Sequence, residues 1–295
     1  PNNNSSSNRN RYSLYGQTQL DFFAGDLIAL IGWRVDFIDQ DFIDTANRFS
    51  TEPLELNETA FSPRLGLVYK PSENVSIYTS YSQSFNPTIG QSVALDIFEP
   101  ERGRQFEVGI KTSFFDDRFS GTLAYYDLTR TNVLTQDVNN TGFQVQVGEQ
   151  KSTGIELDLA GELLPGWNII ANYAYTDARV SDDNEIAVGT RLINSPRNSA
   201  GLWTTYQLQE GALEGLGFGL GVYFVGDRNG ELRRPFEVPG YTRTDASIFY
   251  ERDSFRTQVN FENLFDVRYF EGARDQFRVQ PGSPFGISAS MRWEF

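Results

Sequence analysis

The side chains that most often carry chemistry are unevenly represented in this sequence, because histidine and cysteine are both absent. Without them there is no Ser-His-Asp or Cys-His arrangement, and the usual imidazole and thiolate metal ligands are missing. Two acidic clusters, DQDFID at 39–44 and SDDNE at 181–185, offer the carboxylate oxygens that calcium prefers. Neither has the spaced acidic set with a turn glycine and a final glutamate. Solvated loops are therefore the better interpretation, and hard-cation or lipopolysaccharide bridging is the alternative.

Aromatic and arginine side chains near polar segments are the best candidates for binding a ligand. Aromatic walls suit a bulky ligand whose surface is largely apolar with a few polar groups. For any single one of these residues, anchoring at a membrane interface or packing within a loop is the more common role. The candidate ligand-binding residues are Phe85, Phe98, Tyr269, Phe270, Arg274, Phe277 and Arg278, with Phe285 close to them in the last segment. Without histidine, no serine–carboxylate pair stands out as catalytic.

The elements that position these residues are predicted to be β-strands, because apolar residues recur at every second position along almost the whole chain. The closing stretch SPFGISASMRWEF (283–295) is the plainest example. A period of two places alternate side chains on opposite faces of a strand, and no segment shows a convincing helical period. About 13 strands of roughly 10 residues are expected. The expected spans are 12–23, 27–38, 61–70, 75–85, 103–114, 118–131, 143–163, 167–180, 197–208, 216–226, 241–251, 255–268 and 285–295.

Composition limits what the apolar faces of these strands can contact. The mean hydropathy is −0.43, and the densest apolar run, LIALIG at 27–32, is far shorter than the ~20 residues that a membrane-spanning helix needs. The formal net charge of −14 argues against nucleic acid as a partner. The 24 Phe, 14 Tyr and 4 Trp residues suit a surface that is anchored at a lipid interface.

The connections and the polar strand faces favour a transmembrane antiparallel β-barrel, an all-β fold. Short turns alternate with long polar loops, which is the arrangement of outer-membrane barrels. Ten ionisable residues are expected on the face opposite the apolar one, and unpaired charges are too costly to bury in a dry core. The apolar face is therefore expected to contact lipid and the charged face a wet or plugged interior. The ten are Glu107, Lys111, Glu156, Asp158, Arg243, Asp245, Arg256, Glu262, Arg292 and Glu294.

An odd number of strands suggests that the chain is part of a larger barrel, since single-chain bacterial barrels have even numbers. We expect residues 1–295 to be one partial barrel domain, the C-terminal portion of the whole. The polar start PNNNSSSNRN (1–10) is expected to be the disordered remnant of a loop, and it has no features of a secretory leader.

Several motifs in fixed order resemble those of TonB-dependent siderophore receptors, in particular the ferrichrome and hydroxamate branch. The resemblance covers essentially residues 11–295 and is specific for the family rather than for the ligand. The motifs are PRLGLVYKPSENVSIYTSYSQSFNP (63–87), PERGRQFEVGIK (100–111), LTRTNVLTQD (128–137), STGIELDLAGELLPGWNIIANYAYTDA (152–178), VPGYTRTDASIFY (238–250), NLFD (263–266) and the terminal Phe295.

This resemblance implies the last ~13 strands of a 22-stranded barrel whose lumen is closed by a plug domain. Neither the plug nor the energy-coupling TonB box is found in this sequence. By resemblance, the outer loops and the plug capture an Fe(III)-siderophore, and TonB then drives its release into the periplasm. The protein would be a monomer in the outer membrane of a Gram-negative bacterium, with lipid and lipopolysaccharide around it. It would carry no catalytic residues, no resident metal and no covalent cofactor.

Three other functions remain open. An outer-membrane lipase or protease is argued against by the absence of histidine. A passive porin or adhesin barrel is compatible with long loops, and a receptor for another cargo, such as a cobalamin or a sugar, is compatible with every motif.

Within NLFD, Phe265 is expected to pack, and Asn263 and Asp266 to bond to the backbone where a strand leaves the barrel.

Overall fold

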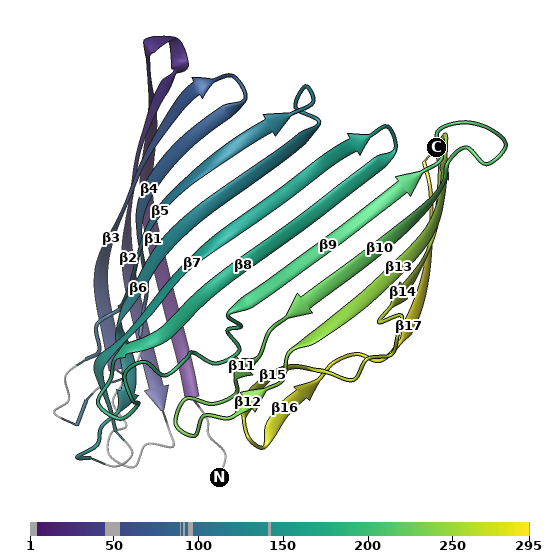
Figure 1. The fold of residues 1–295 in the computed structure, drawn as a ribbon. Helices are drawn as coiled ribbons and strands as arrows, with labels where there is room; N and C mark the ends of the chain where they lie inside the picture. The colour runs from purple at the N-terminus through teal and green to yellow at the C-terminus, as the bar shows by residue number, and fades with distance from the viewer. Residues whose placement is uncertain are drawn as a thin grey trace.

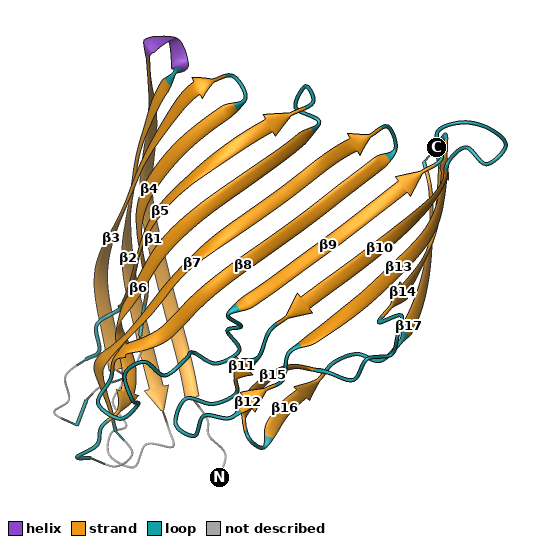
Figure 2. Ribbon diagram, in the orientation of Figure 1, coloured by secondary structure: helices purple, strands orange, loops and turns teal. Residues whose placement is uncertain are grey.

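The chain forms one large antiparallel sheet that curves like part of a cylinder wall, in the computed structural model shown in Figure 1. The structure describes residues 5–44, 54–88, 90, 92–93, 97–140 and 143–294. The sheet has 13 strands, hydrogen-bonded to their neighbours in chain order, and β1 and β17 are its edges. The expected all-β antiparallel architecture is confirmed (Figure 2). No helix within the described ranges is both long and apolar enough to cross a membrane.

The observed strands lie close to the expected spans, and two small extra sheets occur in the loops. The large sheet consists of β1 (Ser5–Phe22), β2 (Leu27–Asp44), β3 (Leu54–Ser72), β4 (Val75–Asn86), β5 (Glu101–Phe114), β6 (Phe119–Gln136), β7 (Gln144–Leu164), β8 (Trp167–Asp182), β9 (Asn198–Gln207), β10 (Leu216–Val225), β13 (Tyr241–Arg252), β14 (Phe255–Glu262) and β17 (Gly286–Trp293). The small sheets pair β11 (Arg228–Asn229) with β12 (Glu237–Val238), and β15 (Phe270–Asp275) with β16 (Arg278–Pro281).

The chain start differs from the expectation. Residues 1–10 were expected to be a loop remnant, but the described part of this segment, Ser5–Asn10, belongs to β1. These residues pair with Asp39–Asp44 of β2, which itself runs beyond its expected end. The expectation is wrong for Ser5–Asn10 because the extended partner strand satisfies their backbone groups, although their polar side chains give no strand signal. The terminal Phe295 lies outside the described residues.

Short turns gather at one end of the sheet and long loops at the other, as expected from the spacing of the strands. The short turns lie at the top of Figure 1, and the long loops lie at the bottom together with β11, β12, β15 and β16. The β1–β2 turn contains the 3₁₀ segment η1 (Phe23–Gly25), where Gly25 has φ 99°. Glycine tolerates this left-handed conformation without steric cost, so the chain can reverse within a few residues.

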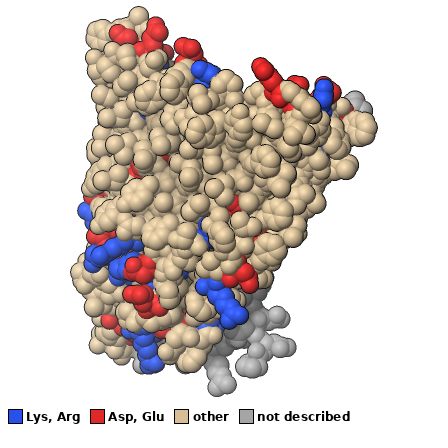
Figure 3. Space-filling model, turned by 45° about the vertical axis from the view of Figure 1, so that its right-hand side comes forward, with Lys and Arg blue, Asp and Glu red and all other residues tan. Residues whose placement is uncertain are grey.

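One face of the sheet is apolar across many neighbouring strands. Ile110 of β5, Leu123 of β6 and Leu157 of β7 lie in one cross-strand row. Leu123 remains 48% exposed. Figure 3 shows a broad surface almost free of charge, with acidic and basic residues concentrated toward its two ends. An exposed apolar band between charged ends is stable in contact with lipid rather than water.

The opposite face is polar, and Gly109 on it lies beneath the ring of Tyr78. Strand alternation places Glu107, Lys111, Glu156 and Asp158 on this side. The Tyr78 hydroxyl donates a hydrogen bond to the Glu107 carboxylate over 2.6 Å, and the Lys111 ammonium lies 5.1 Å from the centre of the Tyr78 ring. Tyr78 thus gives both Glu107 and Lys111 a favourable contact on the polar face, where an unpartnered charge would be costly.

Candidate ligand site at the loop rim

Three long loops come together at the rim opposite the short turns. They span 183–197, 227–240 and 269–284 and contain the two small sheets. Ile193 forms a parallel bridge with Asn229, and the Asn194 backbone N–H donates to the Asn229 carbonyl over 2.9 Å. The Asn229 side chain returns a bond to the Arg191 carbonyl over 2.7 Å. The first two loops are therefore joined by both backbone and side-chain bonds.

Asn194 also attaches the third loop. Its side-chain amide accepts a hydrogen bond from the Ala273 N–H and donates one to the Ala273 carbonyl, both over 2.8 Å. The side chain thus bonds to Ala273 as the backbone of a paired strand does. Asn194 has φ 56°, a left-handed conformation that asparagine tolerates better than most residues. Gly272 leaves room for this contact, since a Cβ there would lie 3.0 Å from the Asn194 Oδ1 atom. One asparagine thus fixes the β15–β16 hairpin against the 183–197 loop.

Arg228 links the second and third loops from a buried position. It is 4% exposed, and its guanidinium donates to the carbonyls of Glu271 over 3.0 Å and Phe270 over 2.8 Å. It also lies 5.5 Å from the centre of the Tyr241 ring. Arginine suits this position, because several N–H groups can bond to carbonyls while the planar group rests against an aromatic ring.

Next to Arg228 in the chain, Asp227 forms an ion pair with Arg191 over 2.8 Å. The bond from Arg191 lowers the pKa of the Asp227 carboxyl below its usual value. Asp227 therefore remains ionised through the neutral range, and its ion pair adds a charged link between the 183–197 and 227–240 loops.

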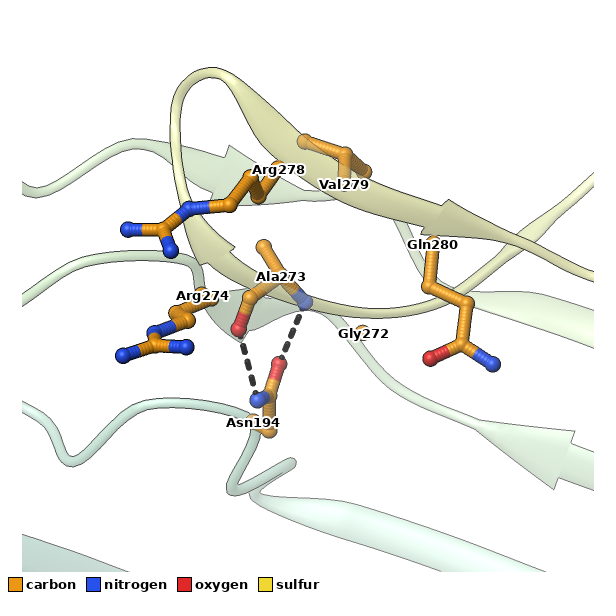
Figure 4. Close-up of a pocket in the computed structure, with 7 residues that line it drawn as sticks. All are labelled: Asn194, Gly272, Ala273, Arg274, Arg278, Val279 and Gln280. Atoms are coloured by element: carbon orange, nitrogen blue, oxygen red, sulfur yellow. Dashed lines mark hydrogen bonds between the residues drawn. The ribbon is translucent and has the colours of Figure 1, made fainter. Parts of the chain in front are cut away.

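A pocket of about 350 Å³ opens between Asn194 and the β15–β16 hairpin (Figure 4). Arg274 and Arg278 extend to the same side of the hairpin, and Gln280 extends the other way. The Arg278 Nε donates to Asp275 over 2.7 Å, and this bond lowers the pKa of the Asp275 carboxyl. The lining residues are Asn194, Gly272, Ala273, Arg274, Arg278, Val279 and Gln280.

The structure therefore brings together the two arginines among the candidate ligand residues, but the aromatic candidates are dispersed. Phe98 is 6% exposed and packs beside Gly90, and Tyr269 is 7% exposed with its ring 4.2 Å from the ring of Tyr241. Phe85 is the last residue but one of β4, and the Arg11 guanidinium lies 5.3 Å from its ring centre. None of these three rings lines the arginine pocket.

The remaining aromatic candidates are exposed. Phe270 is 43% exposed at the start of β15, and Phe277 is 87% exposed at the tip of the hairpin, away from the pocket lining. Phe285, immediately before β17, is 42% exposed. A ligand role for the seven candidate residues stays a prediction.

The residues that build the loop assembly carry no signal in the sequence, because Asn194 and Arg228 look like ordinary polar loop residues. Only part of the NLFD motif behaves as expected. Asn263 is 1% exposed and bonds to the backbone of Val267 and Ser283, and Asp266 accepts from the Phe285 N–H, as expected. The expectation that Phe265 packs is wrong, since it is 70% exposed. A hydrophobic residue in a tight polar turn is pointed outward when its neighbours take the inward positions.

One acidic cluster forms a turn, and the other lies within a strand. Asp183 accepts hydrogen bonds from the backbone N–H groups of Glu185 and Ile186, both over 2.8 Å, which is the pattern of a side-chain-capped turn. The expectation of a solvated loop is wrong for the 39–44 cluster, which forms the end of β2 and pairs with β1. Its side chains from 42 to 44 lie outside the described part of the structure. Within the described ranges, no group of three or more Asp and Glu residues is arranged to hold a metal ion.

Comparison with known proteins gives a consistent result. The family model described as "TonB dependent receptor-like, beta-barrel" matches residues 1–264. The chain is 38% identical over 267 residues to the metal-pseudopaline receptor CntO of Pseudomonas aeruginosa, covering 89% of this chain and 38% of that protein. It is 32% identical over 274 residues to the ferrichrome outer membrane transporter/phage receptor of Escherichia coli, covering 91% of this chain and 36% of that protein.

Solved structures agree with this result. The siderophore receptor PiuA from Acinetobacter baumannii superimposes with a TM-score of 0.87 at 26% identity, covering 98% of this chain and 44% of that one. The chain thus spans less than half the length of the curated relatives that it matches. The similarity to all of them extends over nearly the whole of the curved sheet.

Proposed function

The chain belongs to the TonB-dependent receptor-like β-barrel family, and from this premise we propose that its parent protein imports a ferric siderophore with energy supplied through TonB. The chain lies in the outer membrane of a Gram-negative bacterium, as its relatives do. The observation that carries the proposal is the curved sheet, which has an apolar outer face suited to lipid and a polar face suited to a lumen. At its loop rim, three loops bond to one another and form an assembly with a pocket. Receptors named for ferrichrome and ferrioxamine B are among the relatives.

In this proposal the protein does no bond chemistry. Iron arrives already chelated, as cargo, so the chain needs neither a resident metal nor a covalent cofactor. Capture takes place at the loop rim together with the plug, a segment supplied by the rest of the parent protein, and TonB acts through that same N-terminal part. The barrel works as a monomer, and residues 1–295 form the C-terminal part of its barrel domain.

The test uses the full-length protein that contains this chain. Titration of the purified receptor with ferric hydroxamates should quench its intrinsic fluorescence with a Kd of about 1 µM or tighter. Uptake of radioactive iron from the same chelates should be lost in cells lacking TonB. Binding of a cobalamin or a sugar in place of every ferric chelate would support the alternative cargo, and uptake independent of TonB would support a passive pore.

We also propose that lipopolysaccharide contacts a row of basic residues on the outer face. Three basic residues lie in one cross-strand row, namely Arg104 of β5, Lys151 of β7 and Arg179 of β8. The backbone of Arg179 also forms an isolated β-bridge with that of Arg191. The row lies on the lipid side, four residues beyond Val108, Ile155 and Tyr175 in the direction of the long loops. Lys151 and Arg179 lie on neighbouring strands, about 4.8 Å apart, and Arg104 lies two strands from Lys151. Lys151 also pairs with Asp127 over 2.8 Å and Arg179 with Asp177 over 2.5 Å, so the row offers partly compensated cations to the phosphates of the outer headgroups.

Removing two of these cations should weaken the effect of lipopolysaccharide. We expect purified lipopolysaccharide to raise the Tm of the full-length receptor, and this rise to be at least halved in the Arg104→Gln/Lys151→Gln double variant, because phosphate contacts are charge-assisted. Arg118→Gln, at the short-turn end, is the matched control and should keep the full rise. Equal shifts in the double variant and the wild type would remove the basic row from the lipid contact.

A further inference from the structure

The pocket between Asn194 and the β15–β16 hairpin differs in charge from other pockets of the described structure. Its described lining contains Arg274 and Arg278 and no carboxylate side chain. A neighbouring pocket in the loops is lined by Arg191 and Arg228 but also by Glu237, and a pocket at the short-turn end contains several acidic residues. Carboxylates adjoin the pocket only through lining residues, where Asp275 bonds to Arg278 and Glu271 accepts from Gln280 over 3.0 Å.

The two arginines of this pocket are not neutralised to the same degree. Arg278 is bonded to Asp275, so its charge is compensated within the hairpin. Arg274 is exposed and has no ion pair with any residue in the described ranges. Both guanidinium groups extend to the same side of the hairpin (Figure 4). The pocket therefore presents one uncompensated positive charge beside a second, partly compensated one.

The pocket is held in shape before any ligand arrives. The two bonds between Asn194 and Ala273 fix the hairpin on the 183–197 loop, and Ala273 is only 6% exposed. Arg228 holds the backbone at Phe270 and Glu271, at the start of the same hairpin. Preorganisation of this kind lowers the entropy cost of binding, so a single charged contact can contribute measurably to affinity.

The walls offer no aromatic surface to a ligand. No aromatic ring is among the seven described lining residues, which include the aliphatic side chains of Ala273 and Val279. Phe277, the nearest aromatic residue in sequence, lies at the hairpin tip with 87% of its surface exposed. Recognition here depends on charge and hydrogen bonding, for which guanidinium groups are suited through their planar, paired donors.

This inference rests on the proposed function. We propose that the pocket binds a carboxylate group of the siderophore, one that does not coordinate the iron. The cargo is then a ferric chelate with at least one free carboxylate, whatever groups coordinate its iron. Arg274 supplies the charge-assisted bonds, and Arg278 adds a second donor while Asp275 fixes its position.

Two probes that differ in a single carboxylate test this proposal in the full-length receptor. One linear ferric trihydroxamate is capped with an acetyl group, which is neutral, and the same chelate is capped with a succinyl group, which carries a free carboxylate. We expect the succinyl probe to bind about tenfold more tightly, the scale of one charged contact. Its advantage should shrink as salt rises from 0.05 to 0.5 M, because salt screens exposed charges over roughly one Debye length.

Variants separate this inference from the proposed function. Arg274→Gln should abolish the preference for the succinyl probe while leaving the acetyl probe unchanged, and Arg274→Lys should retain part of it. Arg252→Gln, at the opposite end of the sheet, is the matched control and should behave as wild type. Equal affinity of the wild type for both probes would overturn the carboxylate assignment alone. Failure to bind either probe or any other ferric chelate would overturn the proposed function as well.

Discussion

Replacing Leu123 by arginine should destabilise the folded receptor in lipid by about 2–4 kcal/mol, the cost of a charge on the lipid side of a barrel near the bilayer midplane. Leu123 lies between Ile110 and Leu157 in the middle of the apolar band and is 48% exposed. A guanidinium at this depth has no water and no partner on the lipid side. The measurement is a urea titration of the full-length receptor refolded into vesicles, with folding followed by heat-modifiable gel mobility.

The neighbouring position supplies the matched control. Thr122 lies on the opposite face, between Lys111 of β5 and Asp158 of β7. Thr122→Arg places the same side chain in the polar lumen within reach of a carboxylate, so the expected loss is below about 1 kcal/mol. If Thr122→Arg proved the more damaging of the two, the assignment of lipid and lumen faces would be reversed.

Asn263→Ala is expected to cost about 3 kcal/mol, a large effect for one polar residue. The Asn263 side chain donates to the carbonyls of Val267 and Ser283, both over 3.0 Å, and accepts from the Val267 N–H over 2.9 Å. Alanine removes the partner of all three backbone groups, which are partly buried. Asn263 also has φ 48°, a left-handed conformation in which alanine is strained. The measurement is the same urea titration of the full-length receptor.

Phe265, two residues away in the same turn, provides the comparison. It is 70% exposed, so Phe265→Ala should change the free energy of unfolding by less than about 0.5 kcal/mol, as surface substitutions usually do. A loss with Phe265→Ala as large as that with Asn263→Ala would show that hydrophobic packing, rather than the asparagine network, stabilises the turn.

The strands and their two faces were predictable from the sequence, because each strand carries its own signal. Alternation of apolar and polar residues identifies a strand with one face toward lipid and the other toward the lumen, without knowledge of its neighbours. β5, with Phe106, Val108 and Ile110 at alternate positions, is an example. The strand ends were harder to predict. β1 continues to Ser5 only because β2 pairs with it. The residue pattern of β1 alone does not predict this pairing.

The loop assembly was not predictable, because its contacts join residues far apart in the chain. Asn194 bonds to Ala273 across 79 positions, and Arg228 bonds to Glu271 across 43. β11 and β12 have two residues each, too few for a period to be detected. The arginines of the pocket were identified as candidates by their position in the last long loop, but the burial of Tyr269 depends on contact with Tyr241 of β13.

The order of the strands has a consequence for how fast the sheet can grow. Strands that follow each other along the chain are also neighbours in the large sheet, from β1 through to β17. The entropy lost in closing a loop rises with its length, so pairing between chain neighbours is kinetically favoured over pairing between distant segments. Each strand that has paired presents a fresh edge to the next, and growth can proceed one hairpin at a time. β1 and β17 are the edges of the sheet in the described structure, so any pairing between these two strands would be the slow, long-range step.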